Sequence, residues 1–250
     1  MTVRELAYQK TPLGDLTLRQ RPEPFWGNQD VFEVKLGDEY LMSSLFTEGE
    51  RHLATLGLPH LEGELDVVIG GLGLGYTAAE VLKNKRVSCV LVIDLFQAVI
   101  DWHQDGLVPN GKILTADARC ELRQGDFFEL ARTSFDANAT ERKFNAVLLD
   151  IDHSPAHFLN EQNRSFYTSE GLASVCRQLK PGGCFALWSN DPAAQNFTRL
   201  LGDVFGSATA HTVEFPNPYT NAKSVNSVYV AHKITAGSRN PAIVSSGRRA

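Results

Sequence analysis

The sequence has few cysteines and no long apolar segment. Its cysteines, Cys89, Cys120, Cys176 and Cys184, show no C-x-x-C spacing, which predicts buried reduced thiols and a cytoplasmic protein. No apolar run approaches the roughly 18 residues of a membrane span. The first residues, MTVRELAYQK, lack the apolar core of a secretory signal. We therefore expect neither a membrane-embedded nor a secreted protein.

The chain also lacks an excess of basic residues. It carries 24 Lys and Arg against 29 Asp and Glu, a net charge of -5, and its pI is about 5.8. Because general nucleic-acid binders neutralise phosphates with a basic surface, this balance argues against nucleic acid as a partner. The 250 residues, 43% of them hydrophobic, are enough to bury a core without disulfides or a structural metal.

Apolar patterning divides the chain into three regions. Residues 1–60 contain two alternating runs, 15–18 and 31–36, that predict half-buried strands, followed by a helix over 47–54. Thr47 is its expected N-cap, with Glu50 completing a capping box. Residues 61–235 alternate short apolar runs with helical patterns, which predicts a doubly wound α/β domain with a mostly parallel sheet. The runs at 211–215 and 227–231 predict a closing pair of strands. Residues 236–250 are rich in Ser, Gly and Arg and are expected to form a disordered tail.

A glycine-rich segment follows the first strand of this domain. Gly71, Gly73 and Gly75 are spaced G-x-G-x-G between an apolar run and a helical pattern. Glycine lets the backbone turn sharply and approach a ligand, and the N–H groups of a helix start then face that ligand. The spacing is not the G-x-G-x-x-G of dinucleotide-binding folds, which weakens that interpretation. A purely structural turn is the alternative.

Acidic residues stand at the ends of the strands that follow. Asp94 lies 19 residues after Gly75, where a carboxylate can accept both hydroxyls of a ribose. Asp126 either holds an adenine amino group or caps a helix. Asp150, at the fourth strand end, opens a long loop with Asp152 and His153. Its His and Asp spacing matches no standard metal site, so no metal is expected.

These residues together resemble class I S-adenosylmethionine (SAM)-dependent transferases, and more narrowly the spermidine/spermine synthase, or aminopropyltransferase, family. The glycine loop begins Ile69-Gly-Gly, as in spermidine synthases, whereas methyltransferases usually have an acid at the place of Ile69. The family's Asp-Ser-Ser-Asp-Pro signature corresponds to residues 150–155, and the aromatic pair after it to Phe166 and Tyr167. The helix with Phe46, Glu48 and His52 resembles the family's Tyr-x-Glu and His more loosely. The resemblance implies a Rossmann-like class I methyltransferase fold behind a small β-rich N-terminal region.

The resemblance also implies roles for residues. The adenosyl ligand, SAM or decarboxylated SAM, would be bound by Gly71, Gly73, Gly75, Asp94, Leu95, Asp126, Phe127 and Asp150. Asp150 and Asp152 would be the catalytic acids. A small-molecule acceptor, with an amine among the candidates, would contact Glu48, His52, His153 and Tyr167. For Glu48 and Glu50, a solvated helix face is the favoured interpretation. A homodimer packed through the N-terminal region is also compatible with the family.

The sequence departs from the family at three places that concern the amines. The loop acid that binds the aminopropyl amine is replaced by Gly73, the second acid of the signature falls on His153 or, with a shift, on Asp152, and Phe46 lacks a hydroxyl. We therefore expect a spermidine-synthase-like transferase acting on a small molecule, with methyl transfer favoured. The alternatives are aminopropyl transfer from decarboxylated SAM to a polyamine, and a non-catalytic protein that binds adenosyl ligands.

Overall fold

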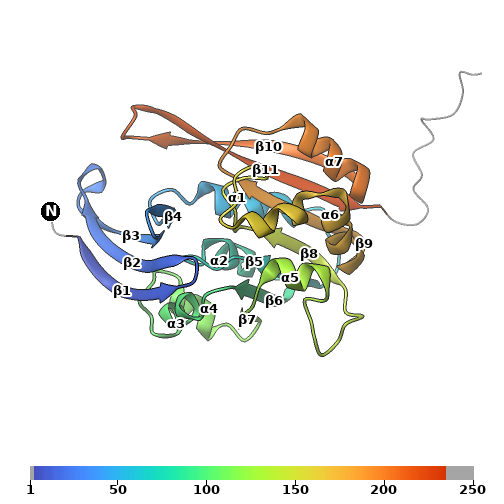
Figure 1. The fold of residues 1–250 in the computed structure, drawn as a ribbon, viewed down its shortest axis with the longest axis horizontal. Helices are drawn as coiled ribbons and strands as arrows, with labels where there is room; N and C mark the ends of the chain where they lie inside the picture. Colours follow the sequence, from blue (N-terminus) through green and yellow to red (C-terminus); the bar gives the residue numbers. More distant parts are fainter. Residues whose placement is uncertain (1–2, 235–250) are drawn as a thin grey trace, which may run out of the picture.

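The computed structural model describes residues 3–234, which form two β-sheets flanked by helices (Figure 1). The expected tail at 236–250 lies outside the described residues. The first sheet has four antiparallel strands in sequence order: β1 (Arg4–Thr11), β2 (Gly14–Glu23), β3 (Gln29–Leu36) and β4 (Glu39–Ser43). A short 3-10 helix, η1 (Pro24–Trp26), joins β2 to β3. The two predicted strands are confirmed within β2 and β3, where alternation buries Leu16 and Leu18 completely.

The second sheet has seven strands in the order β10-β11-β9-β8-β5-β6-β7. Five of them are parallel, while β11 runs antiparallel to β9 and β10 antiparallel to β11. The predicted doubly wound sheet with its antiparallel closing pair is therefore confirmed. The strands are β5 (Leu65–Gly70), β6 (Val87–Asp94), β7 (Cys120–Gln124), β8 (Phe144–Leu149), β9 (Leu179–Ser189), β10 (Gly206–Asn217) and β11 (Ala222–Lys233).

Helices cover both faces of this sheet because its strands are apolar on both sides. Val67 and Ile69 of β5 face the core under α1 to α4, whereas Val68 faces the core under α5 to α7. The helices are α1 (Glu48–Gly57), α2 (Tyr76–Leu82), α3 (Gln97–Gln104), α4 (Gly111–Ala116), α5 (Phe127–Arg132), α6 (Ser169–Gln178) and α7 (Gln195–Phe205), with a 3-10 helix η2 (Glu161–Tyr167) before α6.

Helix α1 follows the N-terminal sheet but packs on the seven-stranded sheet, beside α2 and across β9 and β11. Gly57 permits this approach, since a Cβ there would lie 3.0 Å from Leu148 and 3.3 Å from Ala186. The core under α1 continues into the N-terminal sheet through Leu16, Leu18 and Val34. The two sheets therefore share one core, and a ligand site between them has rigid walls on both sides.

The tip of the β10–β11 hairpin reaches back to the N-terminal sheet, as the upper left of Figure 1 shows. There the hydroxyl of Tyr219 donates to Glu23, and the ring of Tyr219 lies 6.3 Å from that of Phe46. Phe46 also packs against Phe215 of β10, at 5.6 Å. Segments from the two ends of the chain are thus joined across one side of the molecule.

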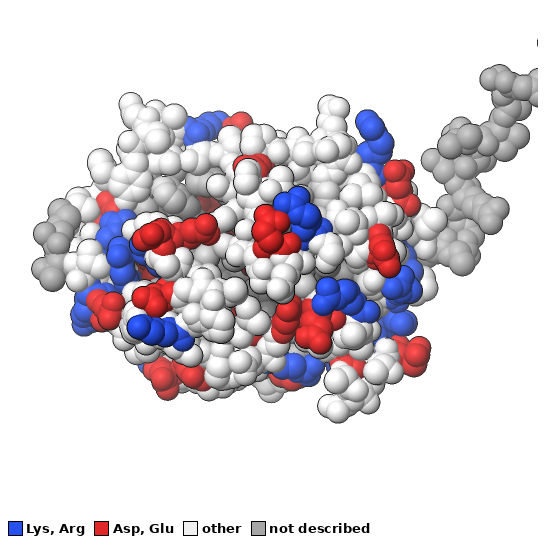
Figure 2. Space-filling model, in the orientation of Figure 1, with Lys and Arg blue, Asp and Glu red and all other residues white. Residues whose placement is uncertain are grey.

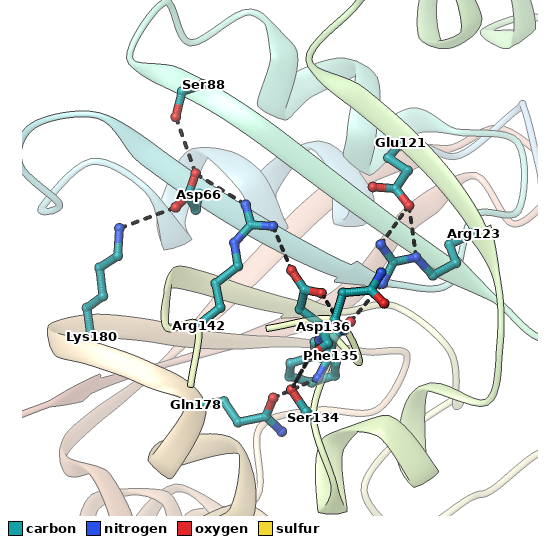
Figure 3. A network of polar contacts seen from close by, with 11 residues as sticks. Asp66, Ser88, Glu121, Arg123, Ser134, Phe135, Asp136, Arg142, Gln178 and Lys180 are labelled. Carbon is teal, nitrogen blue, oxygen red and sulfur yellow. Dashed lines mark hydrogen bonds and ion pairs between the residues drawn. The ribbon is translucent and has the colours of Figure 1, made fainter. Parts of the chain in front are cut away.

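A polar network ties together the amino ends of the parallel strands, at the opposite end of the sheet from the glycine loop (Figure 3). Arg142 lies between Asp66 at the start of β5 and Asp136 of the preceding loop, at 3.8 and 3.1 Å, and Lys180 lies 3.4 Å from Asp66. Gln178 accepts from the N–H of Phe135 at 2.8 Å. We assign this network to the stability of the fold.

All four cysteines are free thiols, as predicted, but only Cys184 is buried; the other three are partly exposed, which corrects the expectation of buried thiols. On the face shown in Figure 2, acidic and basic side chains are interspersed. Within residues 3–234, no helix is both long enough and apolar enough to cross a bilayer.

Replacing Gln178 by Ala should lower the free energy of unfolding by about 1–3 kcal/mol. Besides accepting from Phe135, its buried amide donates to the carbonyls of Leu130 and Ala131, at 3.1 and 2.8 Å. Urea denaturation followed by circular dichroism measures the change. Gln104→Ala, at an exposed site on α3, is the matched control and should stay within about 0.5 kcal/mol of wild type. Equal effects of the two substitutions would contradict the role given to Gln178.

Candidate active site

The carboxyl ends of the parallel strands surround a cavity that encloses about 1120 Å³, part of it open to solvent. Ligands of open α/β sheets bind at this edge, where the strand order reverses. Carboxyl groups from three strand ends, Asp94, Asp126 and Asp150, line the cavity with Glu50 of α1. Its other walls come from the glycine loop and from the N-terminal sheet, including Met42 and Leu36.

The glycine loop turns through three left-handed residues, with φ of 93° at Gly71, 47° at Gly73 and 81° at Gly75. A Cβ at Gly71 would overlap the carbonyl oxygen of Asp150, so only glycine lets the two strand ends approach. Gly71 and Gly73 line the cavity. Gly75 does not; it is the N-cap of α2 and faces Leu114, 2.7 Å from the position of a Cβ. Of the three glycines predicted to contact a ligand, Gly71 and Gly73 therefore lie at the cavity and Gly75 does not.

The carboxylate of Asp94 accepts hydrogen bonds from backbone N–H groups of the glycine loop and so holds the loop in place. It accepts from Leu72 and Phe96, each at 2.9 Å, and from Gly73. Burial raises the pKa of its carboxyl, and these backbone donors oppose the rise. The carboxylate is 9% exposed and lines the cavity. Its remaining lone pairs can accept ribose hydroxyls, beside the 45% exposed side chain of Leu95.

The other N–H groups of the loop also have partners within the protein. Gly71 donates to Ile93, Leu74 to the thioether of Met42 at 2.9 Å, and Gly75 to Leu72. From Gly71 to Gly75, the backbone N–H groups therefore have acceptors within the protein, Asp94 and Met42 among them. The expectation that N–H groups at the helix start face a ligand stays a prediction, because those of Tyr76, Thr77 and Ala78 at the start of α2 have no hydrogen bond to a described residue.

Asp126 caps a helix and also lines the cavity, so its capping role is confirmed and its contact with an adenine amino group stays a prediction. It is the N-cap of α5, where its Oδ1 accepts from Phe128 at 2.8 Å and from Glu129 at 3.2 Å. Its Oδ2 has no hydrogen bond to any described residue, and the side chain lines the cavity together with buried Phe127. One oxygen therefore holds the helix, while the other is available to a donor such as an amino group.

Glu50 and Asp150 form a pair of carboxyls that line the cavity, with Glu50 buried and Asp150 partly exposed at the cavity surface. Glu50 is 8% exposed, and burial together with the charge of Asp150 raises its pKa to about 8. Burial raises the pKa of Asp150 to about 6, opposed by the hydroxyl of Thr77, which donates to its Oδ2 at 2.7 Å. Near neutral pH the two groups therefore hold one proton and one negative charge between them.

Glu50 corrects two expectations. It was assigned to a solvated helix face, yet it lines the cavity. It was also expected to complete a capping box, but Thr47 makes no side-chain capping bond, and the N–H of Thr47 is taken by Glu48 at 3.0 Å. The side chain of Glu50 is free to turn toward Asp150 because Glu48 bonds to the N-cap N–H in its place.

Asp152 lines neither the first cavity nor the second cavity described below. It is 2% exposed and accepts from Tyr167 at 2.8 Å, from Asn163 at 3.0 Å and from the N–H of Leu159 at 2.8 Å. Burial raises its pKa, and these three donors oppose the rise. Asp152 and Tyr167 thus fasten the loop after Asp150 to the core. Neither side chain lines the cavity, so the structure gives no support to the predicted catalytic role of Asp152 or to the predicted substrate contact of Tyr167.

The remaining predicted substrate contacts also differ in whether they line a cavity. His52 is exposed on α1, with its Nδ1 2.7 Å from the carbonyl of Glu48, and neither residue lines a cavity. His153 does line a second cavity, of about 950 Å³ including open solvent. That cavity adjoins the first, since Leu41, Met42, Glu50 and Trp188 line both. Among residues 3–234, no three His, Cys, Asp or Glu side chains are grouped so as to hold a metal.

No sequence pattern predicted a role for two of these shared residues, Met42 and Trp188. Met42 lies on β4, and its thioether covers Gly73 so closely that a Cβ there would overlap it. Trp188, near the end of β9, packs against α1 where Gly49 leaves room for the indole. Strand residues of this kind look like ordinary core positions, and only the fold shows that they lie between two cavities.

Asp126→Asn tests the free oxygen of Asp126. Asparagine also caps helices well, so Oδ1 keeps its bonds, while Oδ2 becomes an amino group that repels another amino group. We expect the affinity for methylthioadenosine, measured by calorimetry, to fall at least about tenfold. Asp203→Asn, at an exposed site on α7, should leave the affinity unchanged. A variant that binds as wild type would remove Asp126 from the site.

Glu50→Gln tests the buried pair through stability. The folded protein keeps a proton on Glu50 that the unfolded chain releases, so wild-type stability should fall as pH rises from the ordinary glutamate range to about 8. The variant has no such proton to lose, so its Tm should fall less than that of wild type between about pH 6 and 8. The corresponding difference in the free energy of unfolding is a few kcal/mol, at about 1.4 kcal/mol per pH unit. Calorimetric scans at several pH values measure this. Glu62→Gln, which is exposed, should follow wild type, and parallel curves for all three proteins would contradict the burial of Glu50.

Relatives in sequence carry one common name. Proteins named polyamine aminopropyltransferase are 25% identical over 193 residues in Oceanobacillus iheyensis, covering 74% of this chain and 35% of the relative, and 28% identical over 150 residues in Pyrobaculum aerophilum, covering 58% and 49%. The relative of that name from Sulfolobus acidocaldarius is 28% identical over 137 residues, covering 53% of this chain and 41% of its own. The matched segments thus span about a third to a half of these relatives.

Solved structures show the same fold. Spermidine synthase from Thermotoga maritima superposes with a TM-score of 0.70 over 92% of this chain and 72% of its own, at 18% identity. A spermidine synthase in complex with the transition-state analogue AdoDATO gives 0.71 over 92% and 74%, also at 18%. The α/β fold is thus of the class I methyltransferase type. The sequence model of the Spermine/spermidine synthase domain matches residues 50–226, and the chain belongs to the spermine/spermidine synthase family.

Proposed function

We propose that this protein transfers the aminopropyl group of decarboxylated SAM to an amine. The names of its relatives, polyamine aminopropyltransferase, support this reaction, as does the family to which the chain belongs. The observation that carries the proposal is electrostatic. Four carboxyl side chains line the first cavity, and no Lys, Arg or His of residues 3–234 lines it.

This lining distinguishes between the two donors. SAM and decarboxylated SAM share the adenosine, the sulfonium and an amino group, but only SAM has a carboxylate. A buried carboxylate needs a base or several N–H donors. The cavity offers no base, and the N–H groups of the glycine loop are already engaged. The preference for methyl transfer came first from the missing loop acid at Gly73 and then from those N–H groups, and it gains no support from the family or the relatives.

The adenosine end of the cavity suits the part that both donors share. Asp94 can accept the ribose hydroxyls and Oδ2 of Asp126 an adenine amino group, while Leu95 and Phe127 provide apolar surface for the ring. The bonds of both carboxylates to backbone N–H groups, together with the burial of Asp94, hold their orientation before a ligand arrives. We assign these four residues to donor binding.

Asp150 and Glu50 act at the reacting centre. The sulfonium of the donor activates the adjacent CH2 group for displacement, so the protein mainly positions the amine and takes up its proton. The ionised Asp150, oriented by Thr77, accepts a proton from the acceptor's ammonium group. The freed nitrogen lone pair forms the new C–N bond while the C–S bond breaks and the sulfur keeps its electron pair. Methylthioadenosine and a protonated secondary amine result.

The protonated Glu50 complements this role. Its proton keeps the pair at a single negative charge, which leaves Asp150 able to ionise in the buried site. That negative charge attracts the acceptor's ammonium group, and it is neutralised when Asp150 takes the proton that frees the nitrogen lone pair. A second candidate function, adenosyl-ligand binding without chemistry, does not account for a carboxyl pair of this kind. The predicted homodimer stays a prediction.

Calorimetry at about pH 7.5 with SAM, decarboxylated SAM and methylthioadenosine tests the donor. We expect decarboxylated SAM to bind at least about tenfold more tightly than SAM, a difference of about 1.4 kcal/mol. Release of methylthioadenosine from decarboxylated SAM in the presence of an amine should follow. Tighter binding of SAM, with methyl transfer to an amine, would overturn the proposal.

Asp150→Asn separates binding from chemistry. It should retain donor affinity within a few-fold and lower turnover by about 10² or more, the low end for loss of a proton acceptor. Full turnover in the variant would mean that Asp150 is only structural. Wild-type protein that binds the donor but releases no methylthioadenosine with any amine would favour the non-catalytic function.

A further inference from the structure

The second cavity adjoins the first across a shared wall, which includes Met42, Glu50 and Trp188. Of the two cavities, Asp150 lines only the first. With the donor in the first cavity, an acceptor in the second therefore has to extend its amine past Glu50 to meet Asp150. The residues that hold the walls of the second cavity in place then contribute to the binding of the acceptor.

One of these walls is the outer half of the β10–β11 hairpin, residues 213–226, which we call the arm. β11 pairs with β9 only from Ser227 to His232, whereas its pairing with β10 continues to Ala222. The arm is therefore a two-stranded ribbon that extends beyond the seven-stranded sheet toward the N-terminal sheet (Figure 1). Four of its residues line the second cavity: Phe215, Ser224, Val225 and Asn226. A two-stranded hairpin is at best marginally stable alone, so the position of the arm depends on its contacts.

The tip of the arm is fastened through one side chain. Among the described residues, every hydrogen bond and ring contact that joins residues 216–224 to the chain outside the arm involves Tyr219. Its hydroxyl donates to Glu23 of the N-terminal sheet. Its ring lies 5.3 Å from that of Phe25 and 6.3 Å from that of Phe46. The other side-chain bonds of the tip stay within the arm.

Glu23 is held in place independently of the arm. Its side chain is 1% exposed and accepts from Arg21 at 2.5 Å and from the N–H of Phe25 at 3.2 Å. Arg21 is fixed in turn by Glu33, 2.7 Å from its Nε, and it also donates to the hydroxyl of Tyr219 at 3.4 Å. The N-terminal sheet thus offers Tyr219 a rigid, charged acceptor, and hydrogen bonds to charged groups are stronger than those between neutral ones.

We propose that Tyr219 is a positioning residue for the acceptor: it holds the arm closed over the second cavity and thereby sets the affinity for the amine. This inference rests on the proposed aminopropyl transfer and adds a residue that lines neither cavity. Val213 is buried at the base of the arm, so loss of the tip contact frees the ribbon beyond it, including Phe215. When the arm is closed for only a fraction of the time, the apparent dissociation constant of the acceptor rises in proportion, whereas the bound complex reacts as before.

Tyr219→Phe removes the hydroxyl and keeps the ring. The full chain is assayed with decarboxylated SAM and with the best substrate among 1,4-diaminobutane, 1-aminobutane and 4-amino-1-butanol. We expect KM for that amine to rise at least about tenfold, with kcat within about twofold of wild type and the affinity for methylthioadenosine unchanged. Tyr8→Phe is the matched control, because Tyr8 is exposed on β1 and lines neither cavity. It should leave KM unchanged.

Amide hydrogen exchange shows whether the arm moves. In Tyr219→Phe the amides of residues 213–226 should exchange at least about fivefold faster than in wild type, whereas those of β5 to β8 should not change. Saturating amine together with methylthioadenosine should return the exchange of the arm toward that of wild type, because a bound acceptor favours the closed arm. A side chain that served only the stability of the fold would raise exchange throughout the chain, without this recovery.

The outcomes distinguish this inference from the reaction on which it rests. Transfer by Tyr219→Phe with an unchanged KM, or with a loss in kcat alone, overturns the inference and leaves aminopropyl transfer in place. If wild type turns over none of the amines, the proposed function fails, and hydrogen exchange then tests Tyr219 by itself. Faster exchange confined to the arm and reversed by an amine would support its role, and equal exchange in the two proteins would overturn it.

Discussion

The hydrogen bonds from Asp94 to the glycine loop determine the character of this site. One buried carboxylate accepts from Leu72, Gly73 and Phe96 and so joins the loop to the end of β6. The same bonds remove the N–H groups with which such loops often bind anions. The loop therefore contributes shape rather than positive potential. What remains at the cavity surface is the negative charge of carboxyl groups, which favours cationic ligands.

Burial of Glu50 beside Asp150 follows from the placement of α1 on the seven-stranded sheet. The helix approaches closely because Gly57 lies against Leu148 and Gly49 against Trp188, and this brings the side chain of Glu50 to the end of β8. Two carboxyls in one buried place cannot both ionise at neutral pH without a large cost. The stability lost through this arrangement is offset by the shared core beneath α1, which holds the helix in position.

The sequence was sufficient for the fold and for one half of the site. Continuous apolar runs predicted the parallel strands, and the strand-end positions of Asp94, Asp126 and Asp150 were enough to place all three at one cavity. Glu50 was missed because a glutamate three residues after Thr47 fits a capping box equally well. Asp152 and Tyr167 bond to each other instead of lining the cavity, and a motif shows which residues are near one another but not which way they point. Met42 and Trp188 depend on how two sheets meet, which no local pattern encodes.

The second cavity depends on contacts between distant parts of the chain. Its walls come from β4, from the end of β9 and from the β10–β11 hairpin, and the hairpin is held against the N-terminal sheet by Tyr219 and Glu23. Glu23 is 1% exposed and also paired with Arg21, so burial of its charge is compensated on both sides. The first cavity takes its carboxyl groups from the sheet edge and from α1, and the N-terminal sheet closes it with Leu36 and Met42. The second cavity draws on that sheet and on the hairpin, so its lining can change through residues such as Tyr40 and Phe46 while Asp94 and the glycine loop stay the same.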